Sequence, residues 1–66
     1  MSVKEEGWVN VARFEKMGPE VDKEKGRIED IALDLGLMPE KVIVVEDGTD
    51  KVEIYVHPEF YSYYQG

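Results

Sequence analysis

Residues 42–56 read VIVVEDGTDKVEIYV, two short apolar runs on either side of an acidic turn. The Asp47-Gly48 pair tolerates the positive backbone angles of a tight hairpin turn, so this stretch predicts a β-hairpin. Its second run alternates, and successive side chains of a strand point to opposite faces. The alternation predicts three residues facing the core and three facing solvent: Val52, Ile54 and Val56 inward, and Lys51, Glu53 and Tyr55 outward.

In two segments that precede the hairpin, the apolar residues recur at the spacing of a strand or of a helix. Residues 8–14, WVNVARF, alternate and carry β-branched and aromatic side chains, which predicts a strand. Residues 21–35 predict a helix whose apolar stripe is formed by four residues, Ile28, Ile31, Ala32 and Leu35. Gly26 weakens the first half of this helix, and Gly36 fits the left-handed position that commonly ends one.

The predicted order of elements is therefore β-α-β-β. One helix packed on a small antiparallel sheet buries the apolar faces of both. We expect a single α+β domain over residues 1–56, followed by an extended aromatic tail over residues 57–66. Chains near this size bury only about 60% of the surface that they expose when unfolded, so the core is thin.

The charge of the chain restricts its partners. Fifteen acidic residues against eight basic ones give a formal net charge of −7. Proteins that bind nucleic acids use Lys and Arg to displace counterions from phosphates, so we expect no direct binding to nucleic acids or to anionic membranes. The chain has no cysteine, and its start, MSVKEEGWVN, lacks the apolar run of a signal peptide. We expect a cytoplasmic protein.

Side chains with catalytic chemistry are few. The chain has one histidine, His57, two serines and one threonine. Ser62 follows His57 by five positions, with no third group in place to orient the pair. The acidic residues of the hairpin lack the ordered spacing of a calcium loop, and His57 with Glu59 supplies at most two metal ligands. We expect no enzyme, no cofactor and no metal.

Aromatic side chains gather at the C-terminus, HPEFYSYYQG. Four of the seven aromatic residues lie in the last seven positions. Because chain ends are usually polar, these side chains need a surface to cover. They either fold back over the sheet as a lid or enter an apolar pocket on a partner, as aromatic hot spots do. The spacing would place Phe60 and Tyr63 on one side of a 3₁₀ turn, with Tyr64 beside them.

The segment HPEFYSYY resembles the PCNA-interacting peptide, by which replication and repair proteins dock on the DNA sliding clamp. That motif has Gln, two residues, an aliphatic residue, two residues and an aromatic pair. Tyr63 and Tyr64 match the pair, while Phe60 stands at the aliphatic position and His57 at the Gln position. The whole chain, short, acidic and with the composition of thermophile proteins, resembles the small Thermococcales inhibitors of PCNA.

The resemblance implies a non-enzymatic archaeal protein that binds the clamp through His57, Phe60, Tyr63 and Tyr64 and inhibits clamp-dependent DNA replication. We expect it to act as a monomer. The helix would widen the contact through its acidic residues, which are candidates to meet basic residues of the partner. These residues are Asp22, Glu24, Glu29, Asp30 and Asp34.

Two alternatives remain. Residues 27–48 resemble the helix-then-strand segment of the β-grasp sulfur carriers, whose C-terminal Gly-Gly carboxylate is adenylated and thiolated. This chain ends in Gln65-Gly66, with one glycine, and has one predicted strand before the helix where that fold has two. The other alternative is an acidic DNA mimic that blocks a nucleic-acid-binding enzyme, which rests on the net charge alone.

Overall fold

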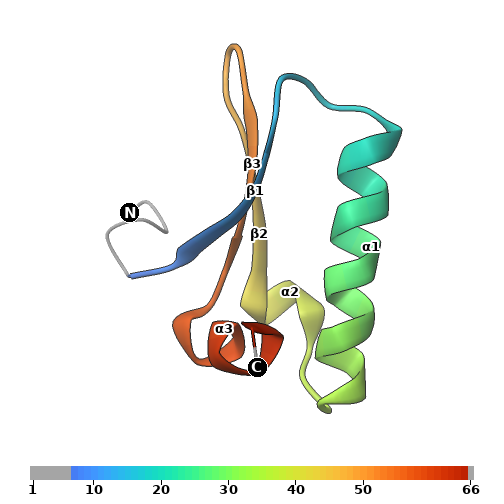
Figure 1. Cartoon of the computed structure of the whole chain (residues 1–66), viewed down its shortest axis with the longest axis vertical. Coiled ribbons are helices and arrows are strands. Elements are labelled where there is room, and N and C mark those ends of the chain that lie inside the picture. Colours follow the sequence, from blue (N-terminus) through green and yellow to red (C-terminus); the bar gives the residue numbers. More distant parts are fainter. Residues whose placement is uncertain (1–6, 66) are drawn as a thin grey trace.

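The computed structural model describes residues 7–65 as three strands and three helices (Figure 1). The strands are β1 (Val9–Phe14), β2 (Ile43–Asp47) and β3 (Val52–Val56), and the helices are α1 (Pro19–Asp34), α2 (Pro39–Val42) and α3 (Pro58–Gln65). Residues 1–6 and Gly66, the ends of the predicted domain and tail, lie outside the described part. The predicted β-α-β-β order and the α+β class are confirmed, and α2 and α3 are additions to it.

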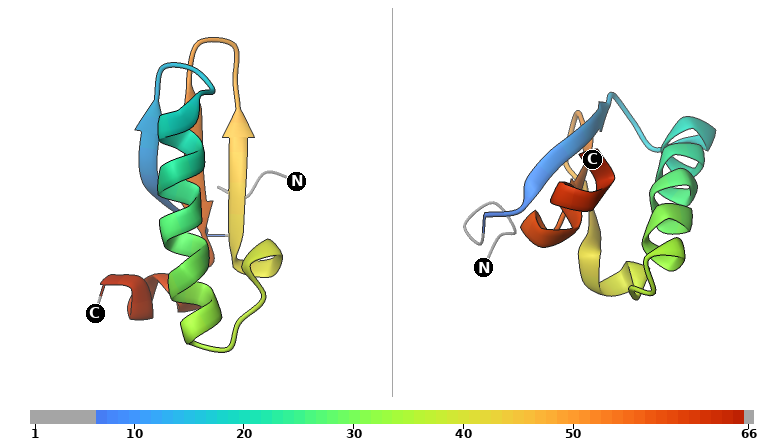
Figure 2. Two further views of the ribbon diagram at one scale, coloured as in Figure 1. Left: turned by 90° about the vertical axis from the view of Figure 1, so that its right-hand side faces the viewer. Right: turned by 60° about the horizontal axis from the view of Figure 1, so that its bottom comes forward.

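The three strands form one antiparallel sheet in the order β1-β3-β2, so the last strand lies in the middle. Helix α1 covers one face of this sheet, and α3 closes the lower end of the space between them (Figures 1 and 2). The core lies in that space, because an apolar helix stripe and an apolar sheet face bury each other there. Its fully enclosed members are Val21, Ile28, Ala32, Ile43, Val52, Ile54, Val56 and Phe60.

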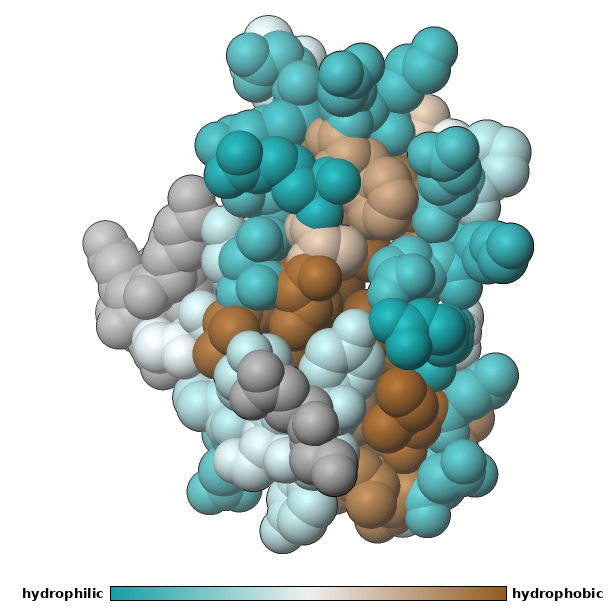
Figure 3. All heavy atoms as spheres, viewed as in Figure 1, coloured by the Kyte–Doolittle hydropathy of each residue, from teal (hydrophilic) through white to brown (hydrophobic). Residues whose placement is uncertain are grey.

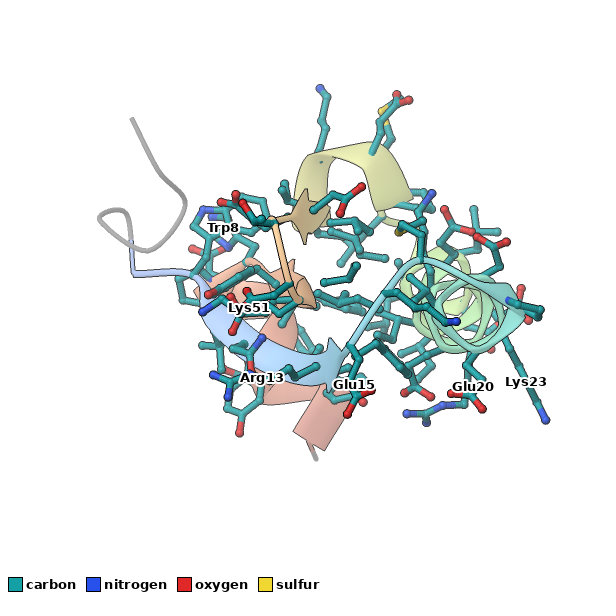
Figure 4. All side chains as sticks on the ribbon, turned by 90° about the horizontal axis from the view of Figure 1, so that it is seen from above. Trp8, Arg13, Glu15, Glu20, Lys23 and Lys51 are labelled. Carbon is teal, nitrogen blue, oxygen red and sulfur yellow. The ribbon has the colours of Figure 1, made fainter. Side chains whose placement is uncertain are left out.

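The central strand is buried on both faces, which corrects the prediction that Glu53 and Tyr55 face solvent. Glu53 is 5% exposed and Tyr55 is 3% exposed. Arg13 Nη2 lies 3.3 Å from Glu53 Oε2, and Lys51 Nζ lies 3.8 Å from Glu53 Oε1. The Tyr55 hydroxyl donates to Glu53 Oε1 at 3.2 Å. Arg13 and Lys51 lie on the side of the sheet away from α1, where Glu53 is their shared partner (Figure 4).

The predicted hairpin forms, but its turn is displaced from Asp47-Gly48. The N–H of Gly48 donates to the C=O of Lys51 at 2.8 Å, so these two residues pair and the chain reverses at Thr49 and Asp50. Gly48 does not have a positive φ. Its lack of a side chain serves a close approach instead, because a Cβ there would lie 3.3 Å from the Lys51 carbonyl oxygen.

Helix α1 begins two residues earlier than predicted and runs without a break through Gly26. It ends at Asp34, one residue before the predicted end, and Gly36 takes the predicted left-handed position. Gly36 has a φ of +77°, and two hydrogen bonds close the last turn: Leu37 N–H to Ala32 C=O at 2.9 Å and Gly36 N–H to Leu33 C=O at 3.0 Å. This is a Schellman motif, in which the left-handed residue lets the chain turn back and satisfy carbonyls that a helix end leaves free.

The C-terminal segment differs from the extended tail that the sequence predicted. Residues 58–65 form the two-turn helix α3, and Phe60 of this helix belongs to the same core as the sheet and α1. The reason is burial: an extended segment would have left a large apolar ring in water, and the thin core has room for it. Within residues 7–65 no helix is both long and apolar enough to cross a membrane.

Candidate partner-binding site at the C-terminal helix

His57 determines where α3 begins. Its C=O accepts the first helical hydrogen bond, from the N–H of Tyr61 at 2.9 Å, and its Nδ1 accepts from the N–H of Glu59 at 3.1 Å. The side chain therefore satisfies one of the N–H groups that the first turn of a helix leaves unpaired. Pro58 follows at a first-turn position, where its missing N–H removes no helical bond. The N–H of His57 donates back to Val42 C=O at 2.8 Å, which ties this corner to the sheet.

Phe60 faces inward, on the side of α3 that meets the core. Its side chain is 1% exposed and is one of the largest fully buried side chains of the protein. Its ring centroid lies 6.1 Å from that of Tyr64, with the two planes tilted by 40°. Truncating a buried Phe to Ala typically costs about 3–5 kcal/mol of unfolding free energy. Phe60 is thus a structural anchor of α3 in this conformation.

Tyr64 connects α3 to α1 through one polar contact. Arg27 Nη2 donates to the Tyr64 hydroxyl at 2.9 Å, and the guanidinium carbon lies 5.7 Å from the ring centroid. Arg27 also pairs with Glu24, one turn earlier on α1. These neighbours, Glu24 first and Tyr64 second, raise the pKa of the Arg27 guanidinium further above its ordinary value. The contact is at the surface, so it carries far less energy than the burial of Phe60.

Tyr63 faces outward and is 64% exposed. It borders a shallow groove of about 520 Å³ between α3, α2 and the turn after α1. Figure 3 shows apolar side chains at the surface of this end of the molecule, bounded by hydrophilic ones. Three further large apolar residues near the end of α1 are exposed: Leu33, Leu35 and Met38. The groove itself is lined by Gly36, Leu37, Met38, Lys41, Val42, His57, Glu59, Phe60 and Tyr63.

The structure brings the four predicted site residues onto one short segment but does not aim them in one direction. His57 is half-buried and caps the helix, Phe60 faces the core, Tyr63 faces solvent, and Tyr64 packs half-buried beside α1. The sequence predicted a 3₁₀ turn in which Phe60 and Tyr63 point in the same direction, but α3 is an α-helix. Because an α-helix turns by about 100° per residue, side chains three residues apart differ in direction by about 60°.

The groove contains residues that the sequence interpretation missed. Leu37, Met38 and Lys41 come from the segment between α1 and β2, which carried no predicted role. A signal was present in residues 35–38, LGLM, because three large apolar side chains around a helix-ending glycine exceed what a solvated turn needs. Leu35 was placed on the buried stripe of the helix, and that prediction is wrong: α1 ends at Asp34, and Leu35 is exposed.

The site combines apolar surface with the polar side chains of Lys41, His57 and Glu59. No group of three or more His, Cys, Asp or Glu residues that could hold a metal ion occurs within residues 7–65. The buried side-chain N and O atoms in that part of the chain all have hydrogen-bond partners. What the arrangement can do is present Tyr63 and the groove to another surface, or release α3 so that Phe60 becomes available. A comparison of the chain with protein-family models, with curated proteins and with solved structures finds no match.

Proposed function

We propose that this chain is a non-catalytic, monomeric binding protein that docks on the archaeal DNA sliding clamp through residues 57–66. By filling the groove that replication proteins use, it would inhibit clamp-dependent DNA synthesis, and the proposal places it in the cytoplasm. The supporting observation is the spacing of His57, which caps α3, and of Phe60, Tyr63 and Tyr64 within α3, a spacing that resembles that of the PCNA-interacting peptide.

Docking in the manner of that peptide requires α3 to leave α1. Phe60 points into the core and Tyr63 points away from it, so the aromatic anchors cannot enter one pocket together while α3 is packed. Exposing Phe60 costs on the order of 3 kcal/mol of apolar burial. A binding-competent state that lies 3 kcal/mol above the packed one weakens the apparent affinity about 100-fold.

The same surface offers a second mode of docking, in which α3 stays packed. Tyr63 and the groove residue Met38 are both exposed and lie at one end of the molecule. In this mode they would form the centre of the contact, with Lys41 and Glu59 at its rim. Phe60 would then serve only to hold the helix in place.

The test is a titration of the full chain against an archaeal sliding clamp, read by calorimetry or co-elution. The double variant Tyr63→Ala with Tyr64→Ala is expected to abolish binding, and Ser62→Ala, exposed on the same helix, is the matched control. Unchanged binding by the double variant would reject the clamp proposal.

Two further variants separate the modes. Phe60→Leu loosens α3 and restores the aliphatic residue of the motif, so it strengthens binding if α3 must be released. Met38→Ala leaves that mode unaffected but weakens binding if the groove is the contact, and Phe60→Leu then gives no gain.

The two alternative functions gain no specific support. Within residues 7–65 only β1 precedes α1, and Gly66, which a carrier would activate, lies outside that part. Two acidic residues of α1 are paired with basic ones: Lys25 Nζ lies 3.7 Å from Glu29 Oε2, and Arg27 pairs with Glu24. Neutralised carboxylates imitate the uniform negative charge of DNA poorly.

A further inference from the structure

The two edges of the sheet are built differently. Strand β1 at one edge contains an irregularity between Asn10 and Ala12, and bulges of this kind twist an edge away from further pairing. Strand β2 at the other edge pairs with β3 in an unbroken register over all five of its residues. Figure 2 shows β2 at the margin of the sheet, with α1 in front of the sheet beside it. Only β2 is regular enough to serve as a template for another strand.

The outward groups of β2 follow from its pairing with β3. Gly48 donates to Lys51, and Val42 accepts from His57, so even-numbered residues of this strand point their N–H and C=O groups at β3. Because backbone groups alternate in direction along a strand, odd-numbered residues point theirs outward.

One of these outward groups is already used, since the N–H of Ile43 donates to Pro39 C=O in α2. The N–H groups of Val45 and Asp47 have no partner within residues 7–65. An incoming strand would meet the outward N–H and C=O groups of Val45 and Asp47, spaced as a sheet requires.

A groove runs beside this edge, between β2 and α1. It has a volume of about 540 Å³ and is lined by Ile43 and Val45 of the strand, Lys25 and Glu29 of the helix, and Pro39 with Glu40 at one end. The side chain of an added residue opposite Val45 would enter this groove, because residues beside each other on neighbouring strands share a face of the sheet.

The chemistry of the groove favours a long basic side chain. Pro39, Ile43 and Val45 form its apolar lining, and the half-buried Glu29 and the exposed Glu40 border it. Lys25 is engaged by Glu29 at 3.7 Å, whereas Glu40 is exposed and has no ion pair within residues 7–65. Lys and Arg lay their alkyl stems along apolar surface and keep their charge at a rim of this kind. A second copy of this chain, also at −7, would be repelled.

We propose that the β2 edge binds an extended basic segment of another protein, which adds as a fourth strand and places a Lys or Arg side chain in the groove between β2 and α1. Main-chain hydrogen bonds at Val45 and Asp47 provide the pairing, as in other cases of strand addition. The acidic surface provides the preference for a basic sequence. This surface is separate from α3, so it does not depend on the clamp proposal.

The experiment uses the full chain and two synthetic peptides, acetyl-KVRVKVR-amide and acetyl-EVEVEVE-amide, with amide hydrogen exchange followed by NMR. The basic peptide is expected to slow exchange of the Val45 and Asp47 amides at least about tenfold, while the amides of Val44 and Glu46, already bonded to β3, change little. The acidic peptide is expected to leave all four amides unchanged.

Variants at one position separate pairing from packing. Val45→Pro removes an outward donor and leaves the bonds to β3 in place, so it is expected to weaken binding of the basic peptide about tenfold or more. Val45→Thr keeps the N–H and the branched shape and is expected to bind as the parent chain does. If Val45→Pro fails to fold, Asp47→Pro against Asp47→Asn makes the same comparison.

Three results would overturn the proposal. They are protection that appears elsewhere and leaves Val45 unchanged, equal binding of the acidic peptide, and a free protein that is dimeric with Val45 already protected. The Tyr63→Ala variant, which weakens either mode of clamp docking, is expected to bind the basic peptide normally, so failure of one proposal is distinguishable from failure of the other.

Discussion

Helices α1 and α3 pack on the same core but are anchored to it to different extents. Helix α1 spans four turns, covers one face of the sheet and supplies Val21, Ile28 and Ala32 to the core (Figure 1). Helix α3 has two turns and supplies one buried core residue, Phe60, with Tyr61 and Tyr64 half-buried against the core. Since stability is distributed unevenly over a structure, elements with few buried contacts open first. The comparison indicates that α3 can open while α1 and the sheet stay folded.

That difference bears on function, because a binding helix that opens alone can change partners without unfolding its domain. The largest part of the opening energy is expected from Phe60, the fully buried side chain of α3, with smaller parts from Tyr61 and Tyr64, which pack half-buried against the core, and from the surface contact between Arg27 and Tyr64. A short helix of eight residues is not stable by itself in water. Once released, it would be ordered again by packing back on the core or, under the clamp proposal, by the surface of the partner.

The largest expected effect comes from truncating one anchor of each helix. Ile28→Ala and Phe60→Ala should each lower the free energy of unfolding, by about 2–5 kcal/mol for Ile and about 3–5 for Phe if the whole domain unfolds. A domain of this size has roughly 3–10 kcal/mol in total. In Ile28→Ala the amides of the sheet should report the full loss of unfolding free energy. In Phe60→Ala they should report a smaller loss, because α3 detaches before the sheet unfolds. Denaturant titration with amide exchange of sheet and α3 amides measures both.

Tyr63→Ala, on the exposed side of the same helix, is the control and should change the unfolding free energy by less than about 0.5 kcal/mol. If Phe60→Ala instead unfolds the sheet as fully as Ile28→Ala does, α3 is not an independent unit. The comparison between the two helices would then be wrong.

The sheet and α1 were predictable because their signals are periodic. Alternation and a helical stripe specify which residues share a face, and the inward residues Val52, Ile54, Ile28 and Ala32 are buried as expected. Periodicity does not say whether the opposite face is covered. Tyr55 is buried because β3 is the middle strand, and that depends on the order of strands in space.

The candidate site was predictable only in part, for a related reason. An aromatic cluster at the chain end shows that something must be covered, and spacing alone does not select between a lid and a partner-binding segment. The helix separates Phe60 from Tyr63 because its turn is 3.6 residues and not three. Met38 was missed because its exposure depends on where α1 ends and how α2 packs.

A smaller effect is expected at the start of α3. His57→Ala removes the Nδ1 acceptor of the Glu59 N–H and should destabilise α3 by about 1 kcal/mol, which raises the amide exchange rate of its residues. His57→Asn supplies another side-chain acceptor at the same position and should restore most of the protection. Equal exchange in the two variants would mean that the ring acts through packing and not through capping.

Gly26→Ala tests the difference between α1 and α3 by stabilising α1 rather than weakening it. Gly26 lies inside α1, without a positive φ, and a Cβ there meets no atom within 4 Å. The substitution should therefore stabilise the protein by about 0.5–1 kcal/mol, since it restricts the unfolded chain and favours the helix. Exchange of the β3 amides, which requires global unfolding, should slow accordingly. Exchange of α3 amides should stay unchanged if α3 opens alone, and should slow equally if it does not.

The smallest effect is expected for Tyr64→Phe, which removes the hydroxyl that accepts from Arg27 and keeps the ring against Phe60. Exchange of α3 amides should rise slightly, whereas Tyr61→Phe, whose hydroxyl has no hydrogen bond within residues 7–65, should have no effect.

The pKa of Arg27 is raised in the folded state, so its contribution is complete at pH values below its unfolded pKa and is lost only in strong alkali. The effect of Tyr64→Phe should therefore be the same at neutral and mildly alkaline pH. An effect that disappears between those two conditions would assign the attachment of α3 to a group other than Arg27.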